Sequence, residues 1–454
     1  MFETMIPLMN EWEKVFPQKR TTERAIKQAI SSVCVLGRRT IARNFLVRGG
    51  DGDWSSEYKL HSRSQWDAQA LFDGVLKEAI KICPDELLPL GTDDTRIKKS
   101  GKKIQTAGWG RDPLSPPFHV NLQYGLRYLH TSLLVPSNPQ CGVSARALPV
   151  WFEEAAPVKK PGKNAKPEEQ QRYREEKKKH NLSTQAVDMF RQMRKKVDEL
   201  GGQEKTLVFA LDGSYCNRTV FQAELERTIL TARTRKDAKL CFPVQEGRRR
   251  YAVETFTPEE VLKDGSRAWS EASIFHGGKV RPVQYKEVKD VLWRRGGGTR
   301  KLRLIVVKPT PYRKTKLGRL LYREPAYLLT TDMSREAASL LQIYFDRWQV
   351  EVAHRELKDN FGLGQAQVRV PSSVARQPVL TVATYSSMHL AALKAFGPQR
   401  SDVFGPLPKY QRDKTRVSCA DLIRYLRNEV VDHPELLPKD LKITEKLILG
   451  AATI

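Results

Sequence analysis

Apolar positions in the first half of the chain change from helical spacing to strand spacing. Residues 23–34 carry apolar side chains three and four apart, which predicts an amphipathic helix, and residues 183–200 repeat this pattern. Between about residues 85 and 155 the period is two, which is typical of half-buried strands. The strands predicted in this half are 120–128, 147–152 and 207–211, the last a short apolar run of the kind found in buried sheets.

The second half is strand-like up to about residue 330 and helical beyond it. The predicted strands are 240–244, 251–256, 280–293, 302–307 and 326–330, and glycine clusters separate several of them. The predicted helices are 335–360, 372–395 and 419–430. Between the two halves, the segment from Lys159 to Lys179 has almost no apolar residue, which indicates an exposed loop or a solvated helix.

These elements place the chain in the α/β (α+β) class and divide it into helical and mixed parts. We expect a helical N-terminal domain over residues 1–80 and a helical C-terminal region over residues 372–454. A mixed core is predicted in two parts, 81–220 and 326–371, with a charged loop at 157–181 in the first part. A β-rich insertion domain over residues 221–325 separates the two parts of this core.

The charge of the chain favours a polyanionic partner. Of its 454 residues, 78 are Lys or Arg and 52 are Asp or Glu, which gives a formal net charge of +26 at pH 7. An excess of this size indicates nucleic acid, since no amphipathic basic helix with a clean apolar face suggests a membrane surface. No apolar run is long enough to span a membrane, and a signal peptide is not expected. The six cysteines show no CxxC or zinc-finger spacing, so structural zinc is not expected.

A basic helical hairpin is predicted near the N-terminus. The helix at 23–34 is followed by Gly37 and then by a second helix that opens with Arg38, Arg39 and Thr40. A helix, a glycine turn and a basic second helix resemble a helix-turn-helix motif, in which the second helix contacts DNA. We therefore expect Arg38 and Arg39 to contact DNA; a basic helical hairpin without that role is the alternative.

The predicted helix 335–360 carries a polar stripe beside its apolar face. At 100° per residue, Arg347, Glu351 and Lys358 fall within about 60° of Tyr344, and Arg355 extends the stripe. This places a carboxylate among cations and a phenol. The carboxylate can ligate Mg²⁺ while the cations hold the phosphates of a DNA strand. A row of surface ion pairs is the alternative interpretation.

Two upstream acids strengthen the metal-binding interpretation. Asp212 closes the strand 207–211, and Asp94 ends another extended stretch. Three carboxylates brought together from two strands and a helix can hold two divalent cations about 4 Å apart, and Mg²⁺ or Mn²⁺ suits such hard oxygen ligands. We therefore expect Asp94, Asp212 and Glu351 to be the catalytic metal ligands. Asp93 is the alternative first acid, because adjacent strand residues face opposite ways.

Two residues near these acids bear on the assignment. Pro89 interrupts the strand expected before Asp94, and proline belongs at strand starts, edges or bulges. Asp332 is a rival for the second acid, but its place before the long helix predicts that it caps free backbone N–H groups.

The polar stripe resembles the signature of a known enzyme family. Tyr344-x2-Arg347-x3-Glu351-x6-Lys358 is similar to the Y-R-E-K signature of bacterial insertion-sequence DDE transposases, the cut-and-paste group related to the kanamycin- and tetracycline-transposon enzymes. Trp348, directly after Arg347, resembles the R-W pair of that family.

The same family is matched by two shorter motifs upstream. Asp94-Thr95 resembles its first-aspartate motif, and Leu211-Asp212-Gly213-x-Tyr215 resembles its second. The resemblance implies an RNase H-like catalytic core, interrupted between Asp212 and Glu351 by the β-rich insertion domain. It covers roughly residues 85–395.

The resemblance implies a metal-dependent endonuclease and strand transferase. Hydrolysis would nick DNA at the transposon end, and the freed 3′-hydroxyl would attack the opposite strand to form a hairpin, on the transposon or on the flank. A second hydrolysis would open the hairpin before transfer into target DNA. Asp94, Asp212 and Glu351 would serve every step with two Mg²⁺ or Mn²⁺ ions. Other residues would bind DNA: Tyr344, Arg347, Arg355 and Lys358 at phosphates, and Trp348 by stacking, unless it packs.

The resemblance also implies partners and a location. Transposases of this kind act as homodimers on transposon-end DNA and target DNA, in the bacterial cytoplasm at the nucleoid; no further protein partner and no membrane are expected. A catalytically inactive, repurposed DNA-binding protein derived from a transposase is the alternative function. A different RNase H-like nuclease is a third, which the β-rich insertion and the tyrosine-bearing helix disfavour.

Overall fold

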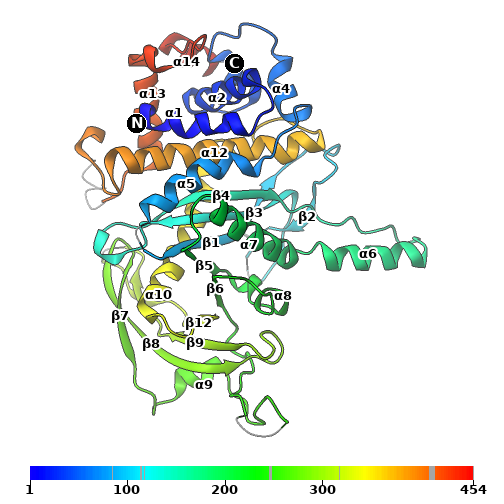
Figure 1. Ribbon diagram of the computed structural model, residues 1–454, viewed down its shortest axis with the longest axis vertical. Helices are drawn as coiled ribbons and strands as arrows, with labels where there is room; N and C mark the ends of the chain where they lie inside the picture. The colour runs from blue at the N-terminus through cyan, green and yellow to red at the C-terminus, as the bar shows by residue number, and fades with distance from the viewer. Residues whose placement is uncertain are drawn as a thin grey trace.

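A mixed β-sheet runs through the centre of the computed structural model (Figure 1). The structure describes residues 1–83, 85–112, 115–116, 118–244, 248–315, 317–407 and 415–452. The strands are β1 (Leu87–Lys98), β2 (Gly108–Arg111), β3 (Leu122–Val135), β4 (Arg146–Glu154), β5 (Thr206–Leu211), β6 (Thr228–Arg233), β7 (Ser270–His276), β8 (Lys279–Leu292), β9 (Lys301–Val307), β10 (Pro311–Arg313), β11 (Leu320–Tyr322) and β12 (Ala326–Thr330).

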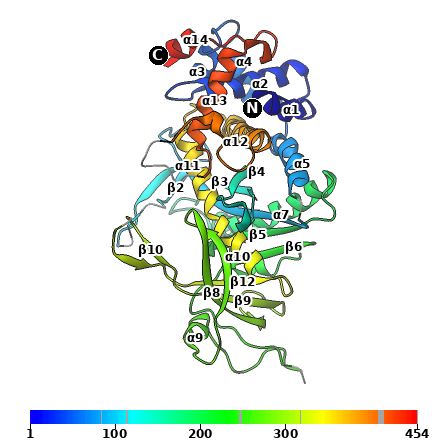
Figure 2. The same cartoon turned by 90° about the vertical axis from the view of Figure 1, so that its left-hand side faces the viewer.

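Helices lie on both faces of this sheet and form a separate layer at one end (Figures 1 and 2). They are α1 (Phe2–Asn10), α2 (Lys19–Cys34), α3 (Ile41–Leu46), α4 (Ser55–Ser62), α5 (Asp73–Ile82), α6 (Pro167–Lys179), α7 (Leu182–Glu199), α8 (Arg218–Phe221), α9 (Pro258–Lys263), α10 (Ala337–Asp346), α11 (Trp348–Asp359), α12 (Pro371–Phe396), α13 (Cys419–Asp432) and α14 (Glu445–Ala452). The mixed α/β class predicted from the sequence is confirmed.

The strand order is β3-β1-β5-β6-β12-β9-β8-β7, and β2 and β4 both pair with the outer edge of β3. β1, β5 and β6 are parallel, while β3 is antiparallel to both β1 and β4. The β-rich part of the chain does not form its own sheet, because β12 pairs with β6 and β9, β8 and β7 continue outward from it. β10 and β11 form a separate hairpin.

The register of β1 against β5 sets where the candidate acids lie. Thr92 of β1 is paired with Leu211, the last residue of β5. The residues that follow, Asp93 and Asp212, are therefore neighbours at the same edge. The proline upstream is accommodated because the pairing of β1 with β3 begins at Leu90, one residue after Pro89, so the missing N–H is not needed in that ladder.

Each face of β1 and β5 packs on a different helix. On one face Phe209 of β5 meets Phe190 of α7, with ring centroids 4.3 Å apart. On the other face α11 comes so close to β1 that a Cβ atom at Gly91 would lie 2.8 Å from Cγ2 of Val350. Gly91 and Asp93 are two residues apart and face the same side. Asp93 therefore faces α11.

The long helix predicted over 335–360 is divided in two at Arg347. α10 ends at Asp346 and α11 begins at Trp348, and Arg347 between them keeps helical dihedral angles of φ −49° and ψ −33°. The stripe of side chains predicted along one helix is therefore largely preserved. The strands predicted at 240–244 and 251–256 are wrong, because the described residues there make only isolated bridges, including Leu240 with Phe256.

The helices at the two ends of the chain lie together in one layer. Figure 2 shows α1 to α4 beside α13 and α14, with α12 between this layer and the sheet. The N-terminal ammonium group binds Oε1 of Glu429 in α13 at 2.8 Å. The charged segment forms α6, an exposed helix without a buried residue. Across the described ranges, no helix is long and apolar enough to cross a lipid bilayer.

Replacing Gly91 with alanine tests the packing of α11 on β1. The new methyl group would overlap Cγ2 of Val350, so we expect the free energy of unfolding to fall by about 1–3 kcal/mol. Urea unfolding followed by circular dichroism measures it. Gly265→Ala is the matched control, since a Cβ there meets nothing within 4 Å. Equal stability of the two variants would contradict this seating of α11.

Candidate active site

Two carboxylates from different elements lie on either side of one guanidinium group. Nη1 of Arg347 lies 3.5 Å from Oδ2 of Asp93 in β1, and Nη2 lies 3.5 Å from Oε1 of Glu351 in α11. The Arg347 side chain is only 12% exposed. Its Nε and Nη1 atoms are buried without a hydrogen-bond partner. The guanidinium therefore compensates the two acids by charge more than by hydrogen bonding.

Asp212 is the third carboxylate. It follows β5 and precedes a short 3-10 helix, Gly213–Tyr215, which its side chain does not cap. Within the described part of the chain, its carboxylate makes no side-chain hydrogen bond or ion pair. Its negative charge raises the pKa values of both Asp93 and Glu351. The three acids are thus electrostatically coupled, and Asp212 is free to accept a ligand.

Burial sets the protonation of Asp93 and Glu351. Desolvation raises the pKa of Asp93 to about 7; Arg347 opposes this shift, and the charges of Asp94 and Asp212 add to it. Desolvation also raises the pKa of Glu351, again against Arg347. Asp93 and Glu351 both have raised pKa values, and a third carboxylate lies nearby. A bound cation would stabilise the ionised forms of these acids.

Asp94, predicted as the first metal ligand, faces the other side of β1. Nε and Nη2 of Arg127 in β3 donate to its two carboxylate oxygens at 2.6 and 2.8 Å. Thr92, two residues earlier and on the same side as Asp94, bonds to Thr131, which in turn contacts Met189 of α7. The geometry therefore favours Asp93, the alternative, as the acid that joins Glu351. The only sign of Arg127 in the sequence is its place on the polar side of a predicted strand, which does not identify its partner.

The remaining stripe residues lie around this cluster. Burial raises the pKa of the Tyr344 phenol, and the charges of Asp212 and Glu351 reinforce the shift. Burial lowers the pKa of Lys358. Arg355 is exposed, and Trp348 is 58% exposed at the start of α11. The stripe predicted from helical spacing thus exists, with its Tyr344 phenol half-buried, while the ring of Trp348 beside it is open to a partner rather than packed.

A buried histidine pair fixes α11 beneath the cluster. Nδ1 of His130 and Nε2 of His354 are 2.7 Å apart, and Nε2 of His130 is 2.8 Å from Oγ of Ser132. His130 is the cross-strand partner of Asp93. Burial lowers the pKa of His130 to about 3, and it also lowers the pKa of His354, so both rings are neutral. One of the two nitrogens in contact therefore carries a proton and donates it to the other. His354 was not predicted from the sequence, although it lies three residues after Glu351, on the next turn of the same helix.

An open groove begins at the end of β5, beside Asp212. Its volume is about 1020 Å³, and it is lined by Gly213, the half-buried Trp293 and several cations: Arg233, Arg235, Lys236, Lys239 and Arg295. Three of these cations pair with acids. Lys239 and Arg295 make no ion pair with any residue that the structure describes. Their positive charges are therefore available to a negatively charged ligand in the groove.

Three further residues named in the sequence predictions are Arg38, Arg39 and Asp332. Nε of Arg39 donates to the Ser32 carbonyl oxygen at 2.9 Å, which ties this side chain to the end of α2. Arg38 is exposed, and the helix after it, α3, has only six residues. DNA contact by either arginine stays a prediction. Asp332 accepts hydrogen bonds from the backbone N–H groups of Ser334 and Arg335. The prediction that it caps the long helix is wrong, because α10 begins at Ala337 with Glu336 as its N-cap, and Asp332 closes the turn before it.

Comparison of the sequence with models of known protein families and with curated proteins finds no match. The assignment of the site therefore depends on its geometry and on the sequence motifs alone.

Replacing each adjacent aspartate with asparagine distinguishes their surroundings. A carboxyl whose folded-state pKa is raised stabilises the fold below its unfolded pKa, and this contribution is lost as the pH rises toward about 7. We expect Asp93→Asn to raise the free energy of unfolding at pH 8 by about 1–3 kcal/mol, and the gain to shrink toward pH 4. Asp94→Asn should instead lower it by about 1 kcal/mol, because it breaks the pair with Arg127. Urea titrations at several pH values measure both, and a loss of stability in Asp93→Asn would contradict the assignment.

Proposed function

We propose that this chain is a DNA transposase of the DDE type, which cuts DNA at transposon ends and transfers the freed strand into target DNA. The observation that carries the proposal is the placement of Asp93 and Glu351 on either side of Arg347, with Asp212 next to Asp93 at the end of the adjacent parallel strand. The Y-R-E-K stripe on α10 and α11 lies beside these acids, as the resemblance implies.

The order of the strands supports an RNase H-like core. β4, β3, β1, β5 and β6 lie side by side in that order, and only β3 runs against the others. This is the arrangement expected of such a core. The β-rich insertion leaves the core after β6 and returns through β12 to α10, between Asp212 and Glu351 as the resemblance implies.

The donor set fits hard divalent cations. The three acids offer only carboxylate oxygens, Asp212 is unpaired among the described residues, and burial disfavours leaving all three charged without a cation. Their donor atoms are not all within 4.8 Å of one another, so one ion bound by all three carboxylates would require side-chain movement. Two Mg²⁺ or Mn²⁺ ions would supply an activated water or 3′-hydroxyl and stabilise the leaving oxygen.

The surrounding side chains would hold the DNA. Arg347 lies between two of the acids and would bind a phosphate at the cut. Lys358, about two helical turns beyond Glu351 on the same side of the helix, would bind a phosphate further along the strand, and Arg355 extends this row outward. The exposed ring of Trp348 can stack on a base. The cationic groove at Gly213 offers a path for the strand beyond the cut. By the same resemblance, we propose a homodimer on paired transposon ends, acting at the bacterial nucleoid.

Cleavage of labelled DNA tests this function. The substrate carries the inverted repeats that flank the gene, and wild-type protein is incubated with Mg²⁺ or with EDTA. We expect nicks and hairpins at the repeat boundary only with Mg²⁺. Glu351→Gln and Asp93→Asn should reduce the cleavage rate by on the order of 100-fold or more, because each removes a metal ligand. Asp94→Asn should keep most of the rate.

Gel-shift affinity for the same DNA serves as the control, and it should change little in these variants. Binding without cleavage by wild-type protein would replace the proposal with a repurposed DNA-binding protein. Loss of cleavage in Asp94→Asn, with Asp93→Asn active, would instead move the first metal ligand to Asp94.

A further inference from the structure

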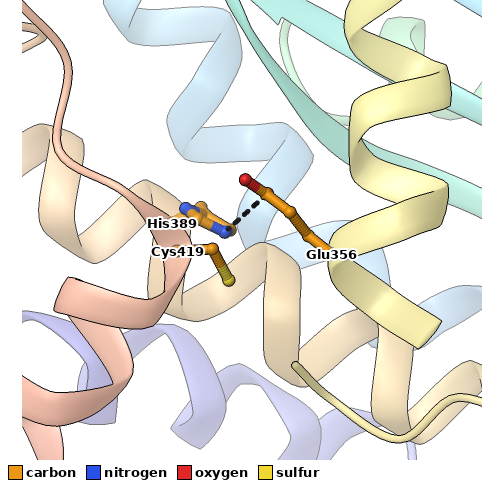
Figure 3. Close-up of side chains that lie close together, drawn as sticks. All are labelled: Glu356, His389 and Cys419. Atoms are coloured by element: carbon orange, nitrogen blue, oxygen red, sulfur yellow. Dashed lines mark ion pairs between the residues drawn. The ribbon is translucent and has the colours of Figure 1, made fainter. Parts of the chain in front are cut away.

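A second cluster of metal-ligating side chains lies where three helices meet, away from the acids of the candidate active site. Glu356 of α11, His389 of α12 and Cys419, the first residue of α13, point toward one another (Figure 3). One potential donor atom from each lies within 4.8 Å of the other two. Within the described ranges this is the only group of three or more such residues with that closeness.

His389 is buried with both ring nitrogens unsatisfied. The residue is 0% exposed, and neither Nδ1 nor Nε2 has a hydrogen-bond partner. Its nearest acidic atom, Oε2 of Glu356, is 3.8 Å from Nε2, which is too long for a hydrogen bond. Buried polar groups are almost always paired in folded proteins. The geometry therefore leaves a place for a ligand between the imidazole and the carboxylate.

The spacing of the donors suits a tetrahedral metal ion. Zinc-nitrogen and zinc-oxygen bonds of about 2.0–2.2 Å at tetrahedral angles put the two ligand atoms roughly 3.4 Å apart. The observed 3.8 Å between His389 and Glu356 needs a movement of only a few tenths of an ångström. The Tyr385 hydroxyl donates to Oε2 of Glu356 at 2.6 Å and orients the carboxylate, as partners of metal ligands commonly do.

We propose that Glu356, His389 and Cys419 bind one transition-metal ion of the zinc type, with a water molecule as the remaining ligand. Mixed nitrogen, oxygen and sulfur donors select Zn²⁺ or Co²⁺ over Mg²⁺. The ion would join α11, which carries Glu351, to α12 and α13. This inference does not depend on the proposed function.

Charged side chains around the cluster affect how strongly a metal ion binds. Arg146 and Arg416 lie close enough to lower the pKa of His389, and both oppose a nearby cation. Burial raises the pKa of the Cys419 thiol, while Arg146 opposes that shift and so favours the thiolate. A bound ion would take the thiolate and the carboxylate as its two negative ligands and release the thiol proton to solvent. The dication is thereby neutralised within its own ligand shell.

A trapped water is the competing explanation for the unpaired imidazole. A cavity of about 20 Å³ adjoins His389 and is also lined by Arg146 and Arg416. This is room for one water molecule. Nη1 of Arg146 is also buried without a partner, so a water there could bridge it to one nitrogen of His389. A water in that cavity and a metal at the other nitrogen are compatible, but the water alone would leave the metal site vacant.

Cobalt binding by the full chain separates these explanations. Metal is first removed with a chelator, and Co²⁺ is then added while the absorption spectrum is recorded. A thiolate ligand produces a charge-transfer band in the near ultraviolet, which carboxylates cannot give, and tetrahedral cobalt produces intense visible bands. We expect one equivalent of Co²⁺ to develop both. Cys419→Ser should abolish the charge-transfer band, and His389→Gln should weaken Co²⁺ affinity by at least about 100-fold.

Two control variants locate the ion. Cys241→Ser removes another buried thiol and should leave the charge-transfer band unchanged. Glu351→Gln should also leave it unchanged, so binding at the candidate active site cannot be mistaken for it. Absence of the band in wild-type protein would overturn the proposal, whether or not the variants fold, and would leave a trapped water beside His389.

Discussion

Burial of several carboxylates at one junction of sheet and helix is the constraint on which the site depends. Asp93 and Glu351 sit on either side of Arg347, each 3.5 Å from a guanidinium nitrogen, and Asp212 adds a third negative charge. One cation cannot neutralise three ionised acids, and desolvation makes the ionised forms of Asp93 and Glu351 more costly. The cluster therefore holds a proton near neutral pH, with a pKa of about 7 at Asp93. Any cation that binds there must displace that proton, so its affinity must rise as the pH approaches this value.

The orientation of α11 follows from contacts on both of its sides. Val350 packs on the bare backbone of Gly91, and His354 shares a proton with His130 directly beneath the cluster. Because Glu351 lies between these two anchors in the sequence, the helix cannot rotate this position away from β1 without breaking one of them. Packing and hydrogen bonding thus hold the acids together against their mutual repulsion.

Much of this arrangement follows from the sequence, since helical spacing alone places Arg347 and Glu351 on one stripe and the apolar run before Asp212 ends at a sheet edge. The choice between Asp93 and Asp94 did not follow. Which of two adjacent strand residues faces the helix depends on the register with β5, and that pairing joins residues far apart in the chain. A local pattern of charges carries no information about it.

Long-range packing also accounts for what the pattern of elements missed. The predicted N-terminal and C-terminal helical regions join in one layer, held in part by the N-terminal ammonium at Glu429. Cysteine spacing gave no reason to expect zinc, because short-range motifs describe only sites built from one loop or hairpin. Glu356, His389 and Cys419 come from three helices that the fold alone brings together.

The two proposed metal sites have different ligands and should therefore select different metal ions. The acids around Arg347 offer only oxygen, and Mg²⁺ accepts such ligands while retaining several waters in octahedral geometry. The junction of α11, α12 and α13 is fully buried at His389 and offers sulfur and nitrogen. A strongly hydrated Mg²⁺ ion would have to lose its waters to enter there and would gain a poor set of ligands. Because Glu351 and Glu356 belong to the same helix, an ion at the junction would stiffen the element that presents Glu351, the proposed catalytic acid, without competing for the Mg²⁺ proposed there.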